Sequence, residues 1–120
     1  MKIAILGPQG TFSHEAALAL EPDATVVFER TIRDVIDRVS ENGADCGLIP
    51  LENSVAGSVG ETLDVLTDTD LTVSREVIHP VVQNLAGSAS TGEIRTVLAH
   101  PQSYAQCEKF LRQHYPAAEI

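Results

Sequence analysis

The sequence is poor in aromatic residues, in positive charge and in cysteine. It contains no tryptophan, three phenylalanines and two tyrosines, and it has 8 basic residues against 17 acidic ones. Because 43% of the 120 residues are apolar, the chain is long enough and apolar enough to bury one core. With so few aromatic side chains, that core must consist mainly of Val, Leu, Ile and Ala.

The formal net charge of −9 argues against two classes of partner. Nucleic acids and anionic membranes are bound through basic patches, and only two of the eight basic residues are lysines. We therefore expect no nucleic acid and no membrane among the partners. Scattered acidity also suits a protein from a high-salt cell, so a halophilic source is one interpretation. Ordinary solubility explains the charge nearly as well.

Long apolar runs and a secretion signal are also lacking. No apolar run approaches the ~20 residues that span a bilayer, and Met1 leads directly into a short run that stops at Gly7-Pro8. The two cysteines, Cys46 and Cys107, do not have metal-ligand spacing. We expect a cytoplasmic protein with two free thiols.

Strand and helix patterns alternate over the first 75 residues. Apolar or β-branched runs predict strands at 3–6, 24–28, 46–49 and 71–74. Helices are expected at 14–20 with Ser13 as N-cap, and after Thr31 with a capping box and a C-terminal stop at Asn42-Gly43. A third is expected from residue 57 or 58, with an apolar face made of Val59, Leu63 and Leu66. This order predicts an α/β fold, a mostly parallel sheet with helices on both faces.

The rhythm changes in the second half. Residues 76–86 form a long extended-looking run, typical of a long strand or a pair of strands that leaves one sheet and enters another. The small and polar run 87–92 follows, and 94–99 predicts another strand. A helix is expected at 103–114 with four inward-facing side chains, those of Tyr104, Cys107, Phe110 and Leu111. Residues 117–120 resemble the opening of a strand. We interpret 1–75 as a first α/β lobe and 76–120 as the beginning of a second, truncated lobe.

Polar side chains follow predicted strands in three places, at 11–13, 52–54 and 100–106. Ligands of open α/β sheets bind at the carboxyl ends of strands, so we expect these segments to share a cleft. The glycine-bearing turn before residue 13 favours an anion, although many such turns bind no ligand. The four histidines share no metal-ligand spacing. A Ser–His–Asp triad stays open, but no serine lies in a nucleophile elbow.

These three segments resemble the prephenate dehydratase family. The matching stretches are Gly-Pro-Gln-Gly-Thr-Phe-Ser at 7–13, Pro-Leu-Glu-Asn-Ser at 50–54 with Gly-Ser-Val at 57–59, and His-Pro-Gln at 100–102 with Gln106-Cys107. They run in order through nearly the whole chain. The resemblance implies a two-lobed architecture similar to type 2 periplasmic binding proteins, of which the second lobe is incomplete in this chain.

Family membership would imply conversion of prephenate to phenylpyruvate in phenylalanine biosynthesis, without cofactor or metal, by a homo-oligomer. It implies catalytic roles for Asn53, Gln106 and Glu52, and substrate binding by Thr11, Ser13, Ser54 and Gln102. Glu52 would either orient neighbouring donors or be a structural carboxylate. His100 is expected to fix the turn before Pro101 rather than to carry a proton.

One family motif does not occur in this sequence. The Thr-Arg-Phe segment, whose threonine is the usual candidate for the proton donor, is lacking, as is a phenylalanine-sensing domain. We therefore expect a nearly inactive N-terminal part of a catalytic domain. Two functional alternatives stay open: arogenate dehydratase, and a non-catalytic lobe that binds a small carboxylate. A purely structural reading would make Asn53 and Ser54 turn and cap residues.

Overall fold

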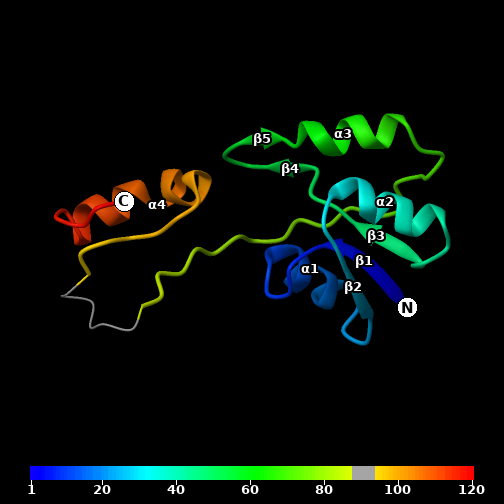
Figure 1. The fold of residues 1–120 in the computed structure, drawn as a ribbon, viewed down its shortest axis with the longest axis horizontal. Coiled ribbons are helices and arrows are strands. Elements are labelled where there is room, and N and C mark those ends of the chain that lie inside the picture. Colours follow the sequence, from blue (N-terminus) through cyan, green and yellow to red (C-terminus); the bar gives the residue numbers. More distant parts are fainter. Residues whose placement is uncertain (88–93) are drawn as a thin grey trace. The chain divides into compact units, whose positions relative to one another are not determined.

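The computed structural model describes residues 1–87 and 94–120, which form two compact units, Met1–Pro80 and Val81–Ile120 (Figure 1). The lobe boundary predicted after residue 75 falls inside the first unit. Most of the predicted small and polar run, residues 88–92, lies outside the described residues. The interpretation of the two halves as lobes of a larger protein stays a prediction.

The first unit is built on a three-stranded parallel sheet of order β2-β1-β3. Strand β1 (Lys2–Leu6) is central, and its Ile3 lies opposite Val26 of β2 (Thr25–Glu29) and Cys46 of β3 (Cys46–Leu48). The three central residues of β1 are no more than 3% exposed. The predicted parallel α/β sheet is therefore confirmed for this unit, since a parallel strand covered on both faces is apolar throughout.

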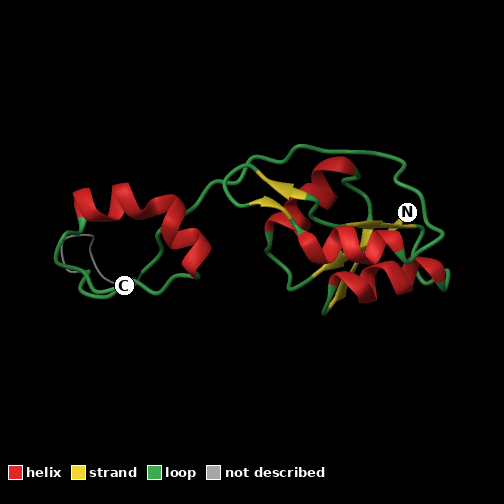
Figure 2. Cartoon of the chain, turned by 90° about the horizontal axis from the view of Figure 1, so that it is seen from above, coloured by secondary structure: helices red, strands yellow, loops and turns green. Residues whose placement is uncertain are grey.

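Helices cover both faces of this sheet (Figure 2). Ala17 of α1 (Phe12–Leu20) packs with Ile3 and Ile5, whereas Val35 of α2 (Ile32–Ser40) packs with Ala4. Successive strand residues point to opposite faces, which is why the odd-numbered and even-numbered residues of β1 join different clusters. The second cluster is entirely aliphatic and the first adds only Cys46 to its aliphatic residues, in agreement with the aromatic-poor composition.

Helix α2 has the ends that the sequence predicts. Thr31 Oγ1 accepts from the backbone N–H of Asp34 at 3.0 Å, and Asp34 Oδ2 accepts from the Thr31 N–H at 3.1 Å. This reciprocal pair satisfies two N–H groups that a helix start leaves without intrahelical partners. Asn42 follows the helix with a φ of 60°, the left-handed conformation that commonly ends helices.

Close approach of α2 to the sheet requires a glycine in β3. A Cβ atom built on Gly47 would lie 2.8 Å from Val35 Cγ1, which is shorter than real Cβ contacts. Strand β3 thus packs directly beneath α2, and it ends two residues before Pro50. The chain that leaves this strand carries the predicted site residues Glu52, Asn53 and Ser54.

Two helix details differ from the prediction. The N-cap of α1 is Thr11 rather than Ser13, because the helix already begins at Phe12. Helix α3 (Gly60–Thr67) buries Thr62 and Val65, whereas Leu63 is 44% exposed. Val59 is the N-cap of α3 and lies outside its helical turns, so the periodicity counted from Val59 gave the wrong face.

The strands predicted at 71–74 and within 76–86 are wrong: residues 71–86, all of them described, form no strand. Strands exist through hydrogen bonds to a neighbouring strand, and no described strand pairs with this segment. Two side-chain contacts connect it to α1 and the residue that follows α1. His79 Nε2 lies within hydrogen-bond distance of Glu15 Oε2, at 3.3 Å, and Arg75 Nη1 forms an ion pair with Glu21 Oε1 at 3.6 Å.

The second unit contains α4 (Pro101–His114) and one parallel β-bridge between Thr96 and Glu119. The strand predicted at 94–99 is thus reduced to a single bridge, and the predicted strand opening at 117–120 supplies its partner. Of the four side chains expected to face inward on α4, Leu111 is buried, whereas Phe110 is 51% exposed and stacks on His114.

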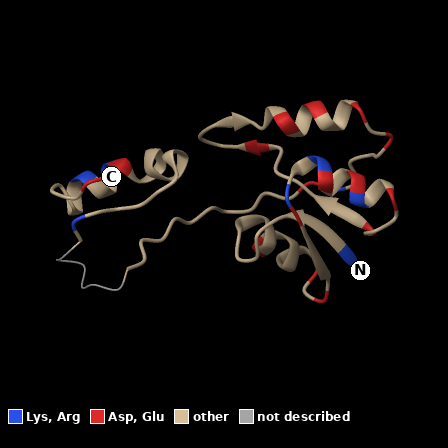
Figure 3. Ribbon diagram, viewed as in Figure 1, with Lys and Arg blue, Asp and Glu red and all other residues tan. Residues whose placement is uncertain are grey.

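The surface charge agrees with the composition. Acidic residues lie along α2 and α3, and basic residues are few on both units (Figure 3). Within residues 1–87 and 94–120, no helix combines the length and apolar character needed to cross a membrane.

Candidate functional site

Two of the three predicted site segments leave the same edge of one sheet. Strands β1 and β3 are parallel neighbours, with Ile5 opposite Leu48, so their carboxyl ends lie side by side. The turn to Thr11 follows β1, and the hairpin that carries Glu52 and Asn53 follows β3. Adjacent carboxyl ends of parallel strands are the usual ligand position in open α/β sheets.

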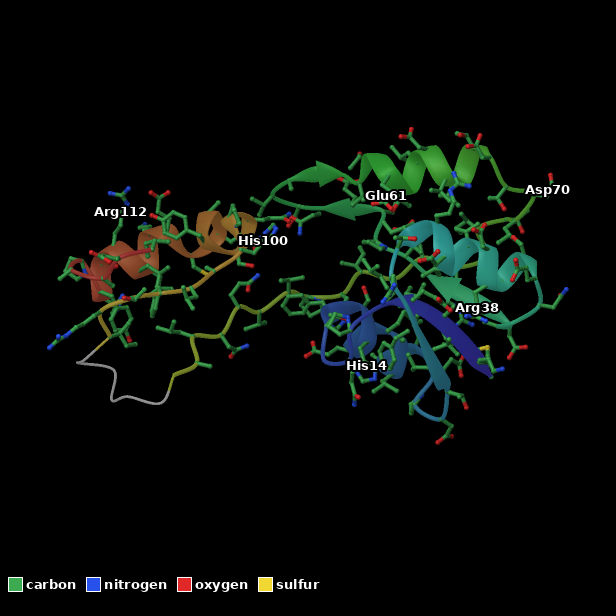
Figure 4. The ribbon with its side chains drawn as sticks, in the orientation of Figure 1. His14, Arg38, Glu61, Asp70, His100 and Arg112 are labelled. Atoms are coloured by element: carbon green, nitrogen blue, oxygen red, sulfur yellow. The ribbon has the colours of Figure 1, made fainter. Side chains whose placement is uncertain are left out.

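The turn after β1 is fixed by an imidazole that the sequence analysis did not single out. Gly10 has a φ of 87°, and its N–H donates to Nδ1 of His14 at 3.1 Å. The His14 N–H in turn donates to Thr11 Oγ1 at 3.4 Å. His14, labelled on α1 in Figure 4, also packs its ring edge-on against Phe28, with the ring centroids 5.2 Å apart.

This arrangement sets what the helix start can offer to a ligand. The N–H groups of Gly10 and His14 are bonded within the turn. Because Thr11 Oγ1 accepts the cap bond, its hydroxyl hydrogen can donate outward. Ser13, half-buried in the first turn of α1, supplies a second hydroxyl.

The segment after β3 forms a small antiparallel hairpin that the sequence analysis missed. Strand β4 (Glu52–Asn53) pairs with β5 (Gly57–Ser58). Asn53 Oδ1 accepts from the N–H groups of Val55 at 2.9 Å and Ala56 at 3.2 Å, so its carbonyl end holds the turn. Its NH₂ end is then the part that can donate to a ligand. Glu52 and Ser54 are exposed.

A buried threonine anchors the start of this hairpin. Thr62 of α3 is fully buried, and its hydroxyl donates to the Pro50 carbonyl at 2.6 Å. The Val59 N–H donates to the Leu51 carbonyl at 2.9 Å, next to that bond. Helix α3 therefore fixes the backbone directly before Glu52 and Asn53.

The third predicted segment lies in the second unit. His100, labelled at the start of α4 in Figure 4, is its N-cap, and its Nδ1 accepts from the Gln102 N–H at 3.3 Å. His100 thus has a structural role at the start of α4, and the expectation that it carries no proton stays a prediction. Gln102 is exposed, whereas the half-buried Gln106 accepts through Oε1 from Nε2 of Gln83 at 3.1 Å.

The structure therefore groups the predicted site residues in two sets. Thr11, Ser13, Glu52, Asn53 and Ser54 belong to the first unit, and Gln102 and Gln106 to the second. Their convergence on one crevice stays a prediction. Within residues 1–87 and 94–120, no group of three His, Cys, Asp or Glu side chains is placed to hold a metal ion.

Three supporting residues escaped the sequence analysis: His14, Thr62 and Gln83. The spacing of Gly10 and His14, four residues apart across a helix start, was a usable local signal. Thr62 and Gln83 bond to partners 12 and 23 residues away, and no local pattern encodes such contacts.

The thiol of Cys46 lies in β3, directly before the hairpin segment. Burial raises its pKa, and the neighbouring Asp45 carboxylate raises that pKa further. A thiol with a raised pKa is a poor nucleophile near neutral pH because little thiolate is present. This side chain packs against Ile3, Ile5 and Ala17 as part of the core.

Fold and candidate site together define an α/β protein in which hydroxyl and amide side chains follow the carboxyl ends of two adjacent parallel strands. Ligands of open α/β sheets bind at this edge. The sequence profile of the family named "Prephenate dehydratase" matches residues 3–120. The chain belongs to the prephenate dehydratase family.

Similar proteins agree with this assignment. The chain is 37% identical over 121 residues to the prephenate dehydratase of Lactococcus lactis subsp. lactis, covering all of this chain and 43% of that protein. It is 34% identical over 122 residues to the bifunctional chorismate mutase/prephenate dehydratase of Aquifex aeolicus, again covering all of this chain and 34% of that protein.

A solved structure is similar over almost the entire chain. The crystal structure of prephenate dehydratase from Arthrobacter aurescens in complex with L-Phe matches with a TM-score of 0.86 at 29% identity, covering 99% of this chain and 41% of that one. The chain thus spans less than half the length of these relatives.

Proposed function

We propose that this chain forms the N-terminal part of the catalytic domain of a cytoplasmic prephenate dehydratase that acts in phenylalanine biosynthesis. The observation that carries the proposal is the family match over residues 3–120, which includes all three polar segments. The site geometry supports it, because two of these segments leave neighbouring strand ends in the first unit. The complete enzyme would have two lobes with the substrate between them, and would be a homo-oligomer.

The reaction requires little covalent chemistry from the protein. The prephenate dianion takes up one proton at its ring hydroxyl, and the C–O bond breaks to release water. The electrons of the bond to the ring carboxylate aromatise the ring, and that carboxylate leaves as carbon dioxide. Phenylpyruvate, with one negative charge, is the product. The protein has to orient a doubly charged acid and place one proton donor.

Neutral hydrogen-bond donors suit this substrate because they hold carboxylates without tying them into tight ion pairs. We assign the amide NH₂ groups of Asn53 and Gln106 to the reacting end of prephenate, since both carbonyl ends accept bonds within the protein. Glu52 would orient neighbouring donors from its exposed position in β4.

Four further residues would bind the carboxylates of prephenate without taking part in the chemistry. Thr11 and Ser13 present hydroxyl groups at the start of α1, where the helix dipole favours negative charge. Ser54 and Gln102 are exposed in the hairpin loop and in the first turn of α4.

Turnover by this 120-residue chain alone should be negligible, because it contains no Thr-Arg-Phe segment to supply the proton. The test measures phenylpyruvate formed from prephenate by the complete enzyme and by the isolated chain, with arogenate as the competing substrate. We expect one phenylpyruvate and one carbon dioxide per prephenate with the complete enzyme only. Phenylalanine formed faster from arogenate, or binding of prephenate without turnover, would overturn the proposal.

A further inference from the structure

Gln106 has a neighbour whose role the reaction does not by itself explain. Gln83 lies in the extended segment before residue 88, and its Nε2 donates to Gln106 Oε1 at 3.1 Å within the second unit. Gln106 projects from the second turn of α4, and both side chains are half-buried. A helix and an extended segment 23 residues apart in sequence are thus joined by a bond between two amides.

A primary amide has two different ends, and its partner decides which end faces a ligand. A carbonyl oxygen attracts donors and repels a carboxylate, whereas the NH₂ group offers two donors. With Oε1 held by Gln83, the NH₂ group of Gln106 is left for a ligand. Rotation of the amide by half a turn would instead aim the carbonyl oxygen at the substrate and replace attraction by repulsion.

From this geometry we infer that Gln83 is a positioning residue, which holds the Gln106 amide with its NH₂ group toward the anionic substrate. The inference rests on the proposed function, because it gives Gln83 a role through a residue assigned to prephenate. Gln83 itself need not touch the substrate. Its contribution is to exclude the reversed orientation of one amide.

Substitutions of Gln83 that change only its hydrogen-bonding character test this role in the complete enzyme. Gln83→Met removes the donor at nearly constant volume, and kcat for prephenate should fall about 10-fold, the usual size for one hydrogen bond. Gln83→Glu can only accept, so it favours the reversed Gln106 amide, and kcat should fall about 10²-fold. Gln83→Lys keeps a donor and should retain activity within about 3-fold of the wild type.

The same substitutions in a Gln106→Met background separate positioning from a general effect of charge or folding. If Gln83 acts through Gln106, then Gln83→Glu should cost no further activity once Gln106 is replaced. Gln113→Glu is the matched control, since it places the same charge on an exposed position of α4 and should leave kcat unchanged.

The possible failures are distinguishable. An inactive wild-type enzyme overturns the proposed function and not the geometry at Gln83. An active wild type with equal kcat values for Gln83→Glu and Gln83→Lys overturns the positioning role. Higher activity for Gln83→Glu than for Gln83→Lys would mean that Gln106 donates to residue 83, the reverse of the bond described here. Full additivity with Gln106→Met would also overturn it.

Discussion

At the scale of single residues, we assign two tasks to the amide of Asn53, one observed in the structure and one proposed. Its carbonyl oxygen closes the loop between β4 and β5 by accepting from two backbone N–H groups, and its NH₂ group is the end available to substrate. A turn role and a ligand role are therefore not alternatives at this position. The sequence alone left the two readings in competition, because both are usual for asparagine after a strand.

Substitutions at Asn53 can separate these two tasks. In Asn53→Asp the carboxylate still accepts from Val55 and Ala56, so the hairpin should persist while the NH₂ donor is lost. We expect kcat for prephenate to fall about 10²-fold in the complete enzyme, with Tm close to that of the wild type. Asn53→Ala should lower both kcat and Tm. Wild-type turnover in Asn53→Asp would restrict Asn53 to the turn.

The pH dependence of a core thiol is also a residue-scale property. Because burial and the Asp45 charge raise the pKa of Cys46, the thiolate should be scarcer than in a free cysteine at every pH below that pKa. In a Cys107→Ser background, iodoacetamide should react with Cys46 more slowly than with free cysteine at pH 8. Asp45→Asn should increase the rate, since a negative neighbour is removed. An unchanged rate in that variant would contradict the assigned cause.

At the scale of secondary-structure elements, much of the first unit could be predicted from the sequence, because the patterns that define its strands and helices are local. The apolar run of β1, the capping box at Thr31 and the Asn42-Gly43 stop each depend on residues a few positions apart. The inner face of α3 could not be predicted, because its buried residue Thr62 is polar and forms a hydrogen bond to the Pro50 carbonyl. Hydrophobic periodicity does not reveal a bond of this kind. The strands of the hairpin, with two residues each, are likewise too short to show the alternation of apolar and polar residues that predicts a strand.

The anchor between α3 and the hairpin can be tested through one backbone amide. Thr62→Val keeps the shape but leaves the half-buried Pro50 without a donor to its carbonyl, which costs about 1–2 kcal/mol. The N–H of Val59, bonded to Leu51 beside that carbonyl, should then exchange with solvent about 10-fold faster. Thr62→Ser keeps the hydroxyl and should preserve slow exchange. Equal exchange in both variants would show that the anchor is unimportant.

At the scale of the whole molecule, the strands expected at 71–74 and within 76–86 failed for one physical reason. A strand is a pairing, and a sequence reveals β-branched, apolar character without revealing whether a partner exists. Here Val73 and Ile78 are 72% and 89% exposed, and the described chain supplies no ladder for their segment. Exposed β-branched and apolar side chains are also what a strand would have if its partner strand lay elsewhere in a complete protein.

Only part of the candidate site could likewise be predicted from the sequence. The motifs identified the three segments and the family, and the structure added the orientation of two amides and the partners that fix them. Residues that support a site from a distance, such as Gln83 and Thr62, carry no motif of their own. Their identification required coordinates, because their partners lie 23 and 12 residues away.

Our central proposal is that Asn53 and Gln106 each donate a hydrogen bond to prephenate in the complete enzyme. The most direct test measures kcat for prephenate in the complete enzyme for Asn53→Ala, from the first unit, and for Gln106→Ala, from the second. We predict that each substitution lowers kcat by about 10²-fold, the usual loss for one transition-state donor. Unchanged turnover in both variants would contradict the account.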